Sequence, residues 1–293
     1  MIRWGACAGL LTLVAGVAAA QEASPPLPAL PHLSASVRVA GLAGAGVAMP
    51  GYASSVFDNP SAIGPIRTLS IEGAYARLPD DSWYTTGAAA VRAGRFNVGG
   101  GYRYLRYLGD QPVTDNLQWV AAGVYRLAGA AVGGSAKYIS VEDSSGRVFR
   151  TLTSDAGVTL AFFDIAAVAL SLQNLGRYSL SGERVVVPSS THLGFSMNLI
   201  DTYSNGRLLG TIETIWADGE PRRTVFGVEA GAVFGGVGLV GRFGVGAQSP
   251  ASGVTRTSYG ASVVLPRTRV DYAYQRQSAL GRSVHLVGFS WTP

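Results

Sequence analysis

The sequence has almost no cysteine and few charged side chains. Cys7 is the only cysteine among the 293 residues, and Lys137 is the only lysine. Cys7 lies in an N-terminal segment that we expect to be removed, so disulfides, cysteine–metal sites and thiol nucleophiles are excluded from the mature chain. Charged residues make up 14% of the chain, and the net charge of +5 comes from scattered arginines. Nucleic-acid binding needs a clustered basic patch, so we predict no nucleic-acid partner.

Histidine is scarce as well, which bears on catalysis. The three histidines are His32, His192 and His285. Ser189 and Ser190 lie close to His192, but no acidic residue stands at a recognisable spacing and no nucleophile-elbow motif surrounds them. Three histidines without a mature cysteine give no clear transition-metal site. We therefore predict that the chain is not an enzyme and uses no metal or other cofactor.

No apolar run is long enough for a transmembrane helix. The one sustained apolar segment follows Arg3 and ends in Ala18-Ala19-Ala20, which predicts a secretory signal peptide over residues 1–20. Residues 21–36 are rich in proline, which predicts an extended leader without packed structure. Residues 37–65 carry small side chains and too few bulky apolar ones for a core of their own. We expect this stretch to pack as a plug against residues 66–293.

From residue 66 onward, segments with alternating polarity are separated by turn signals. About fourteen strands can be counted if each spans the ~9–11 residues of a membrane-crossing strand. Short connections, such as 93–95 and 234–236, alternate with longer ones, such as 108–115 and 176–188. This alternation is typical of bacterial outer-membrane barrels. The connection at 201–207 is the exception, because it is long where a short one is due.

The two faces of each predicted strand differ in polarity. In residues 269–277, Val270, Tyr272 and Tyr274 share one face, while Arg269 and Asp271 share the other, since side chains alternate along a strand. A soluble sandwich could also bury the apolar faces, but the rhythm of the connections favours a barrel. A barrel of this size is too wide for apolar side chains to fill.

The polar face is therefore expected to line the lumen. An Arg or Lys on the lipid face costs roughly 2–4 kcal/mol at the bilayer midplane, and aromatic residues near strand ends suit the membrane interfaces. Mixed charge signs in the lumen favour a structural salt-bridge network over a selectivity ring. The predicted lumen-facing residues are Glu72, Arg92, Arg103, Arg126, Lys137, Asp155, Glu213, Glu229, Arg242, Arg269 and Asp271.

The stretch GLAGAGVAMPGYASSVFDNPSAIG, residues 41–64, is rich in glycine and contains Asn59-Pro60-Ser61. Its glycines lack the G-x-G-x-x-G spacing of a nucleotide loop, and Asn59-Pro60 suits the start of a short helix. The stretch resembles the N-terminal plug of FadL-like outer-membrane barrels, whose motif is a glycine-rich run followed by Asn-Pro-Ala. We place the plug or gate residues at Phe57, Asp58, Asn59 and Pro60.

Later segments resemble the PorV/PorQ branch of the same group. These segments are KYISVED, SDAGVTL, LSLQNLG, GVEAG and the closing DYAYQRQSALGRSVHLVGFSW. The resemblance implies a fourteen-stranded all-β barrel with an N-terminal plug. FadL-type members are passive conduits for hydrophobic compounds, whereas PorV-type members receive exported proteins in type IX secretion.

We predict a monomeric β-barrel of the bacterial outer membrane that contacts outer-membrane lipid and passes small hydrophobic molecules. One alternative is a docking component of type IX secretion, with secretion-system or exported proteins as partners. A second alternative is a structural barrel with a sealed lumen. The chain is shorter than typical members of the family, so the resemblance implies trimmed loops.

Overall fold

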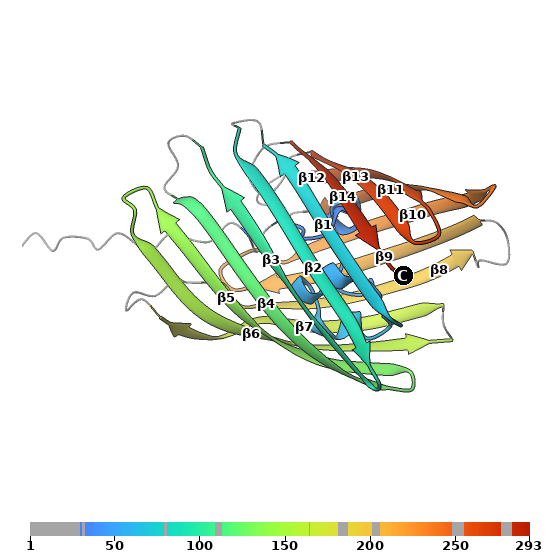
Figure 1. Ribbon diagram of the computed structural model, residues 1–293, viewed down its shortest axis with the longest axis horizontal. Helices are drawn as coiled ribbons and strands as arrows, with labels where there is room; N and C mark the ends of the chain where they lie inside the picture. The colour runs from blue at the N-terminus through green and yellow to red at the C-terminus, as the bar shows by residue number, and fades with distance from the viewer. Residues whose placement is uncertain are drawn as a thin grey trace, which may run out of the picture.

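The computed structural model is a closed antiparallel barrel of fourteen strands (Figure 1). Each strand pairs with its neighbours in the chain, and β1 closes the ring on β14. The predicted fold class and strand number are confirmed. Among the residues that the structure describes, no helix is long and apolar enough to cross a membrane. The structure describes residues 30, 33–78, 81–108, 113–163, 165–180, 187–200, 206–247, 255–276 and 283–293.

The barrel is preceded by three short helices, α1, η2 and η3. Their bounds are Val37–Gly41, Ala53–Phe57 and Pro60–Ile63. The strands are β1 Leu69–Arg77, β2 Trp83–Ala93, β3 Phe96–Arg106, β4 Val113–Leu127, β5 Ala130–Asp143, β6 Val148–Phe162, β7 Ala166–Ser179, β8 Ser190–Ile200, β9 Gly206–Ala217, β10 Arg223–Phe234, β11 Val237–Ala247, β12 Thr255–Val264, β13 Thr268–Arg276 and β14 Val284–Trp291.

The two ends of the barrel differ in their connections. The tight turns after β2, β4 and β10 lie at one end, together with the start of β1 and the end of β14. The longer connections, such as those after β3, β7 and β11, lie at the opposite end. We call these the short-turn end and the long-loop end. The exceptional connection at 201–207 belongs to the short-turn end, and residues 201–205 lie outside the described residues.

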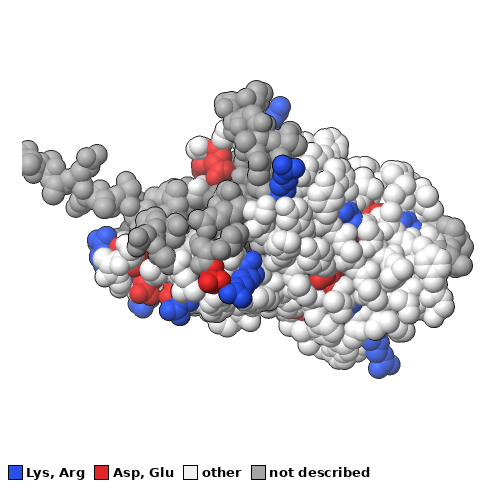
Figure 2. Space-filling model, turned by 90° about the horizontal axis from the view of Figure 1, so that it is seen from above, with Lys and Arg blue, Asp and Glu red and all other residues white. Residues whose placement is uncertain are grey.

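The outer face of the barrel is apolar. Val270 and Tyr272 of β13 are 52% and 41% exposed, whereas Asp271 between them is 3% exposed. The predicted faces of this strand are confirmed, and the same alternation holds for Trp119 on β4, which is exposed next to the buried Gln118. Figure 2 shows a wide area with few charged side chains toward the right, while most charged side chains gather toward the left.

An apolar surface of this extent is incompatible with water around the barrel, because soluble monomers rarely expose contiguous apolar patches beyond a few hundred Å². The same surface suits the hydrocarbon region of a membrane, where the closed ring also satisfies every strand edge. The fold is that of a transmembrane β-barrel.

Residues 33–66, which we call the inner segment, run inside the ring of strands (blue in Figure 1). The helix α1 contacts β11 to β14, η2 contacts β1 to β4, and η3 contacts β3 to β6. Val56, Phe57 and Ile63 form a buried cluster with Ala88 of β2 and Val120 of β4. The small residues of the inner segment therefore complete a core with the barrel wall.

Residues before 37, the predicted start of the plug, also pack against the barrel wall. Leu30 and Leu33, within the region expected to be an unpacked leader, are buried against Tyr84, Leu105 and other apolar side chains that line the long-loop end. The difference arises because these wall residues form an apolar surface that the sequence of the leader does not reveal.

Inward-facing glycines on the barrel wall leave space for the inner segment to lie against it. A Cβ added at Gly133 would lie 2.9 Å from the backbone nitrogen of Ser61, and one added at Gly227 would lie 2.9 Å from the Cβ of Leu42. Real Cβ atoms do not approach other heavy atoms this closely, so the wall must lack a side chain at these points. The inward glycines that touch the inner segment in this way are Gly101, Gly133, Gly157, Gly194, Gly227, Gly244 and Gly288.

Candidate functional site

Asn59 fixes the centre of the inner segment. It is fully buried, caps η3 by accepting a hydrogen bond from the Ser61 backbone N–H at 3.0 Å, and precedes Pro60 at the first helical position. Its amide nitrogen donates to the carbonyl of Val47 at 2.9 Å and to the hydroxyl of Thr159 on β6 at 3.2 Å. One side chain thus joins η3, an earlier part of the inner segment and the barrel wall.

The preceding residues, Phe57 and Asp58, face the lumen charges. The guanidinium of Arg103 lies 4.8 Å from the centre of the Phe57 ring, a distance at which the cation and the ring attract. Asp58 is partly buried, and this burial raises the pKa of its carboxyl to about 6, although Arg103 opposes the shift. Its carbonyl accepts a hydrogen bond from Gln173 of β7. The four predicted gate residues therefore lie together inside the barrel.

Three carboxylates of the wall hold the inner segment. Glu229 of β10 binds the guanidinium of Arg38 on α1 through two hydrogen bonds of 2.7 Å. Glu213 of β9 accepts hydrogen bonds from the consecutive backbone N–H groups of residues 46 and 47, at 2.8 and 2.9 Å. Glu72 of β1 accepts one from the Ser54 backbone N–H at 3.2 Å. The attachment is polar and distributed around the ring.

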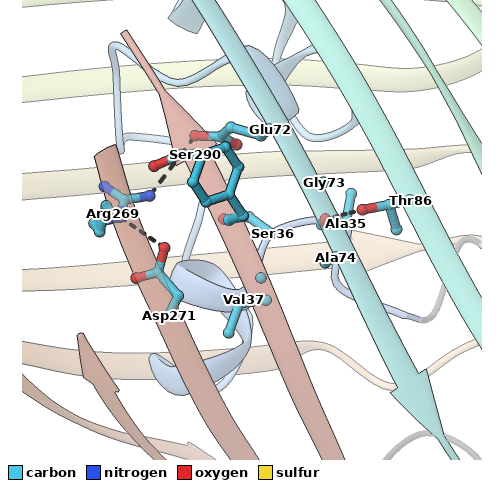
Figure 3. Close-up of a pocket in the computed structure, with 12 residues that line it drawn as sticks. Ala35, Ser36, Val37, Glu72, Gly73, Ala74, Thr86, Arg269, Asp271 and Ser290 are labelled. Atoms are coloured by element: carbon cyan, nitrogen blue, oxygen red, sulfur yellow. Dashed lines mark hydrogen bonds and ion pairs between the residues drawn. The ribbon is translucent and has the colours of Figure 1, made fainter. Parts of the chain in front are cut away.

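Two of these carboxylates, Glu229 and Glu72, belong to a longer chain of charges. Glu229 also binds Arg242 at 2.7 Å, and Arg242 lies 3.1 Å from Asp271. Asp271 binds Arg269 at 2.6 Å, and Arg269 lies 3.7 Å from Glu72 (Figure 3). The alternating signs neutralise one another, which is how buried charges are stabilised. This arrangement agrees with the predicted salt-bridge network.

The remaining predicted lumen residues lie in other places. Lys137 and Asp155 form a buried pair at 2.6 Å across β5 and β6, and Arg103 is buried against Gln118 of β4. Arg126 is half buried. Arg92 has the inward register of β2, opposite the buried Asn97, but lies at the rim next to the turn, where its side chain is exposed. Its guanidinium donates to the carbonyl of Gly94 at 3.0 Å.

Sequence reasoning missed how Glu213 relates to the pair Ser190 and His192. The His192 Nδ1 lies 2.7 Å from Glu213 Oε1, and its Nε2 lies 2.9 Å from the Ser190 hydroxyl. Glu213 belongs to the next strand, β9, whose pairing with β8 places it opposite Gly194. The signal available in the sequence was the inward parity of both strands, which puts the three side chains on one face.

Two recesses lie on either side of the inner segment. At the short-turn end a recess of about 320 Å³ is lined by apolar residues such as Met49 and Leu209 and by Arg38 and Arg207. At the long-loop end a smaller apolar pocket is lined by residues that include Leu33, Leu78, Tyr84, Val284 and Leu286. No group of three His, Cys, Asp or Glu side chains that could hold a metal ion occurs in the described part of the chain.

Comparison with solved structures shows which proteins share this fold. The toluene transporter TbuX of Ralstonia pickettii is 13% identical, with a TM-score of 0.62 over 86% of this chain and 97% of that one. The monoaromatic hydrocarbon channel CymD is 11% identical, with a TM-score of 0.62 over 87% and 96%. A FadL homologue of Pseudomonas aeruginosa is 12% identical, with a TM-score of 0.57 over 87% and 98%.

The comparisons by sequence give no match. No protein-family model matches the chain, and no curated protein matches it significantly. The finer resemblance to the PorV/PorQ branch therefore stays a prediction. At these levels of identity the solved structures establish the fold, and that fold is the one shared by FadL-type channels and hydrocarbon transporters.

Proposed function

We propose that the chain is an outer-membrane conduit for small hydrophobic molecules, with the inner segment as its gate. The apolar outer face and the closed ring suit a membrane barrel. The predicted signal peptide provides for export. The solved structures with the same fold include a toluene transporter and a monoaromatic hydrocarbon channel.

The observation that carries the proposal is the position of the inner segment between two recesses. The pocket at the long-loop end is apolar but has a volume of only about 10 Å³, roughly that of one water molecule, so it must widen before a hydrophobic molecule can enter. The recess at the short-turn end, about 320 Å³, is large enough for a small aromatic molecule. Passage between them requires the inner segment to move aside.

Movement of the inner segment would break separate contacts with the wall and leave the strand pairing intact. These contacts are polar anchors, small side chains that sit over glycines, and buried apolar side chains such as Phe57 and Ile63. The hydrogen bonds of Asn59 to Val47 and Thr159 form the central attachment. Loss of this attachment would loosen the gate and leave the strands of the barrel paired.

Uptake by intact cells tests the proposal. A Gram-negative host without its own hydrocarbon channels would produce either this chain or an empty vector, and entry of radiolabelled toluene would be timed. We expect faster entry with the chain and faster still with Asn59→Ala. The outward Gly241, whose added Cβ would meet nothing within 4 Å, gives the control Gly241→Ala, which should behave as the native chain.

Equal uptake with the chain, with Asn59→Ala and with the empty vector would contradict the conduit and leave a sealed structural barrel. Native mass spectrometry of protein extracted from its own membrane distinguishes the remaining alternative. A bound apolar small molecule supports the conduit, whereas a stoichiometric protein partner supports the docking role.

A further inference from the structure

We infer that Ser190, His192 and Glu213 form a nucleophile–base–acid triad that hydrolyses small apolar esters inside the lumen. The hydroxyl of Ser190 lies 2.9 Å from Nε2 of His192, and Nδ1 of His192 lies 2.7 Å from Oε1 of Glu213. Both distances fall in the range that a nucleophile, its base and the group that orients the base require. This activity goes beyond conduction.

The acid of the triad is held in place by the inner segment. Oε2 of Glu213 accepts the backbone N–H groups of Gly46 and Val47, so Oε1 is left to accept from His192. An Nδ1–H that donates to Glu213 leaves Nε2 of the neutral imidazole without a proton. Nε2 can then accept the proton of the Ser190 hydroxyl, which is the step that activates a serine nucleophile.

The nucleophile and base are also accessible. Ser190 is partly exposed, and the side chain of His192 is 15% exposed, whereas the side chain of Glu213 is 4% exposed. The serine and histidine stand two residues apart on β8 and so project from the same inward face. The neighbouring Ser189 has no such partner, because its hydroxyl donates to Asp218.

Gln173 is placed to stabilise the oxyanion. It lies directly opposite Ser190 in the pairing of β7 with β8, where facing Cβ atoms are about 4.5–5.5 Å apart. One N–H of its amide donates to the carbonyl of Asp58, and a glutamine amide carries two N–H groups. We assign the second to the oxygen that becomes negative during attack, a role that glutamine side chains fill in other hydrolytic sites.

The surroundings favour an apolar substrate. Val187, three residues before Ser190, is fully buried in a cluster with Val113, Ile139, Val141 and Phe149. Three residues span at most about 10 Å, so this apolar cluster begins within that distance of Ser190 along the chain. A short-chain carboxylic ester matches both the cluster and the nucleophile.

The reaction balances with water as the second reactant. The Ser190 oxygen attacks the carbonyl carbon while its proton moves to His192 Nε2. The C–O bond to the alcohol then breaks, the alcohol leaves with that proton, and the acyl group stays on Ser190. Water gives a proton to His192 and its oxygen to the acyl carbon, and the bond to Ser190 breaks as the proton returns to the serine. The products are a carboxylic acid and an alcohol.

A fluorophosphonate probe tests the nucleophile in the full-length barrel refolded in detergent. Intact-mass spectrometry should show one adduct, which peptide mapping places on Ser190. The adduct should be absent in Ser190→Ala and at least about 100-fold slower to form in His192→Asn. Ser189→Ala is the matched control and should react as the native chain does. Hydrolysis of p-nitrophenyl butyrate should follow the same order.

Glu213→Gln separates catalysis from structure. Glutamine can still accept the N–H groups of Gly46 and Val47 through its oxygen, but its amide nitrogen cannot accept from His192. We expect a folded barrel, judged by its heat-dependent shift in electrophoresis, with ester hydrolysis reduced by at least about 100-fold.

Absence of an adduct on the native chain, or an adduct that survives Ser190→Ala, would overturn the triad. Either result would leave the conduit proposal untouched, because Ser190→Ala should still admit toluene in the uptake assay. Loss of toluene uptake together with normal probe labelling would reject the conduit and retain the triad.

Discussion

Glu229 is the side chain that ties the inner segment most firmly to the wall. Its two oxygens bind Arg38 through two hydrogen bonds and Arg242 through a third, and all three side chains are buried. Replacement by glutamine removes the negative charge that both guanidinium groups face. Breaking a buried ion pair from one side typically costs about 3–5 kcal/mol, so Glu229→Gln should lower the thermal unfolding temperature of the refolded barrel clearly.

The pair Arg77–Asp81 provides the control for this prediction. It has the same chemistry and a short distance of 2.5 Å, but both side chains are more than two-thirds exposed. Exposed pairs contribute little because water screens them, so Asp81→Asn should leave the unfolding temperature nearly unchanged. Equal effects of the two substitutions would show that the network around Glu229 does not anchor the inner segment.

At the scale of the strand, the sequence predicts well which face each side chain occupies, because side chains alternate with a period of two residues. The spacing of Tyr272 and Asp271 alone predicts opposite faces, and the structure places the first outside and the second inside the barrel. The triad could not be assigned in this way. Glu213 meets His192 only through the register of β8 with β9, and a register depends on turns and packing that span the whole hairpin.

The path of the inner segment inside the barrel could not be predicted from the sequence either. Gly133 and Gly227 appear as ordinary strand glycines, which usually indicate a bulge or a weak point. Their meaning depends on Ser61 and Leu42, which come from a distant part of the chain and lie against them. A motif could suggest that a plug exists, but only the assembled ring shows where it rests.

The glycine contacts give a prediction for the inner segment as an element. A Cβ at Gly157 of β6 would overlap the side-chain oxygen of Asn59. Gly157→Ala should therefore displace the segment near η3 and raise the ion conductance of the barrel in planar bilayers. The outward Gly241→Ala places the same methyl group in open space and should conduct like the native chain. Identical conductance of both variants would mean that the segment stays in place without this contact.

At the scale of the whole molecule, the cost of a charge on the apolar outer face should depend on its depth in the bilayer. Val228 lies near the middle of β10 and Leu265 in the turn after β12, and both are 44% exposed. An outward arginine costs roughly 2–4 kcal/mol at the bilayer midplane and about 0–1 kcal/mol near the interface. Val228→Arg should thus lower stability against urea in lipid vesicles far more than Leu265→Arg. Because the two positions are equally exposed, water around the barrel would make the two penalties equal, and that outcome would contradict a membrane location.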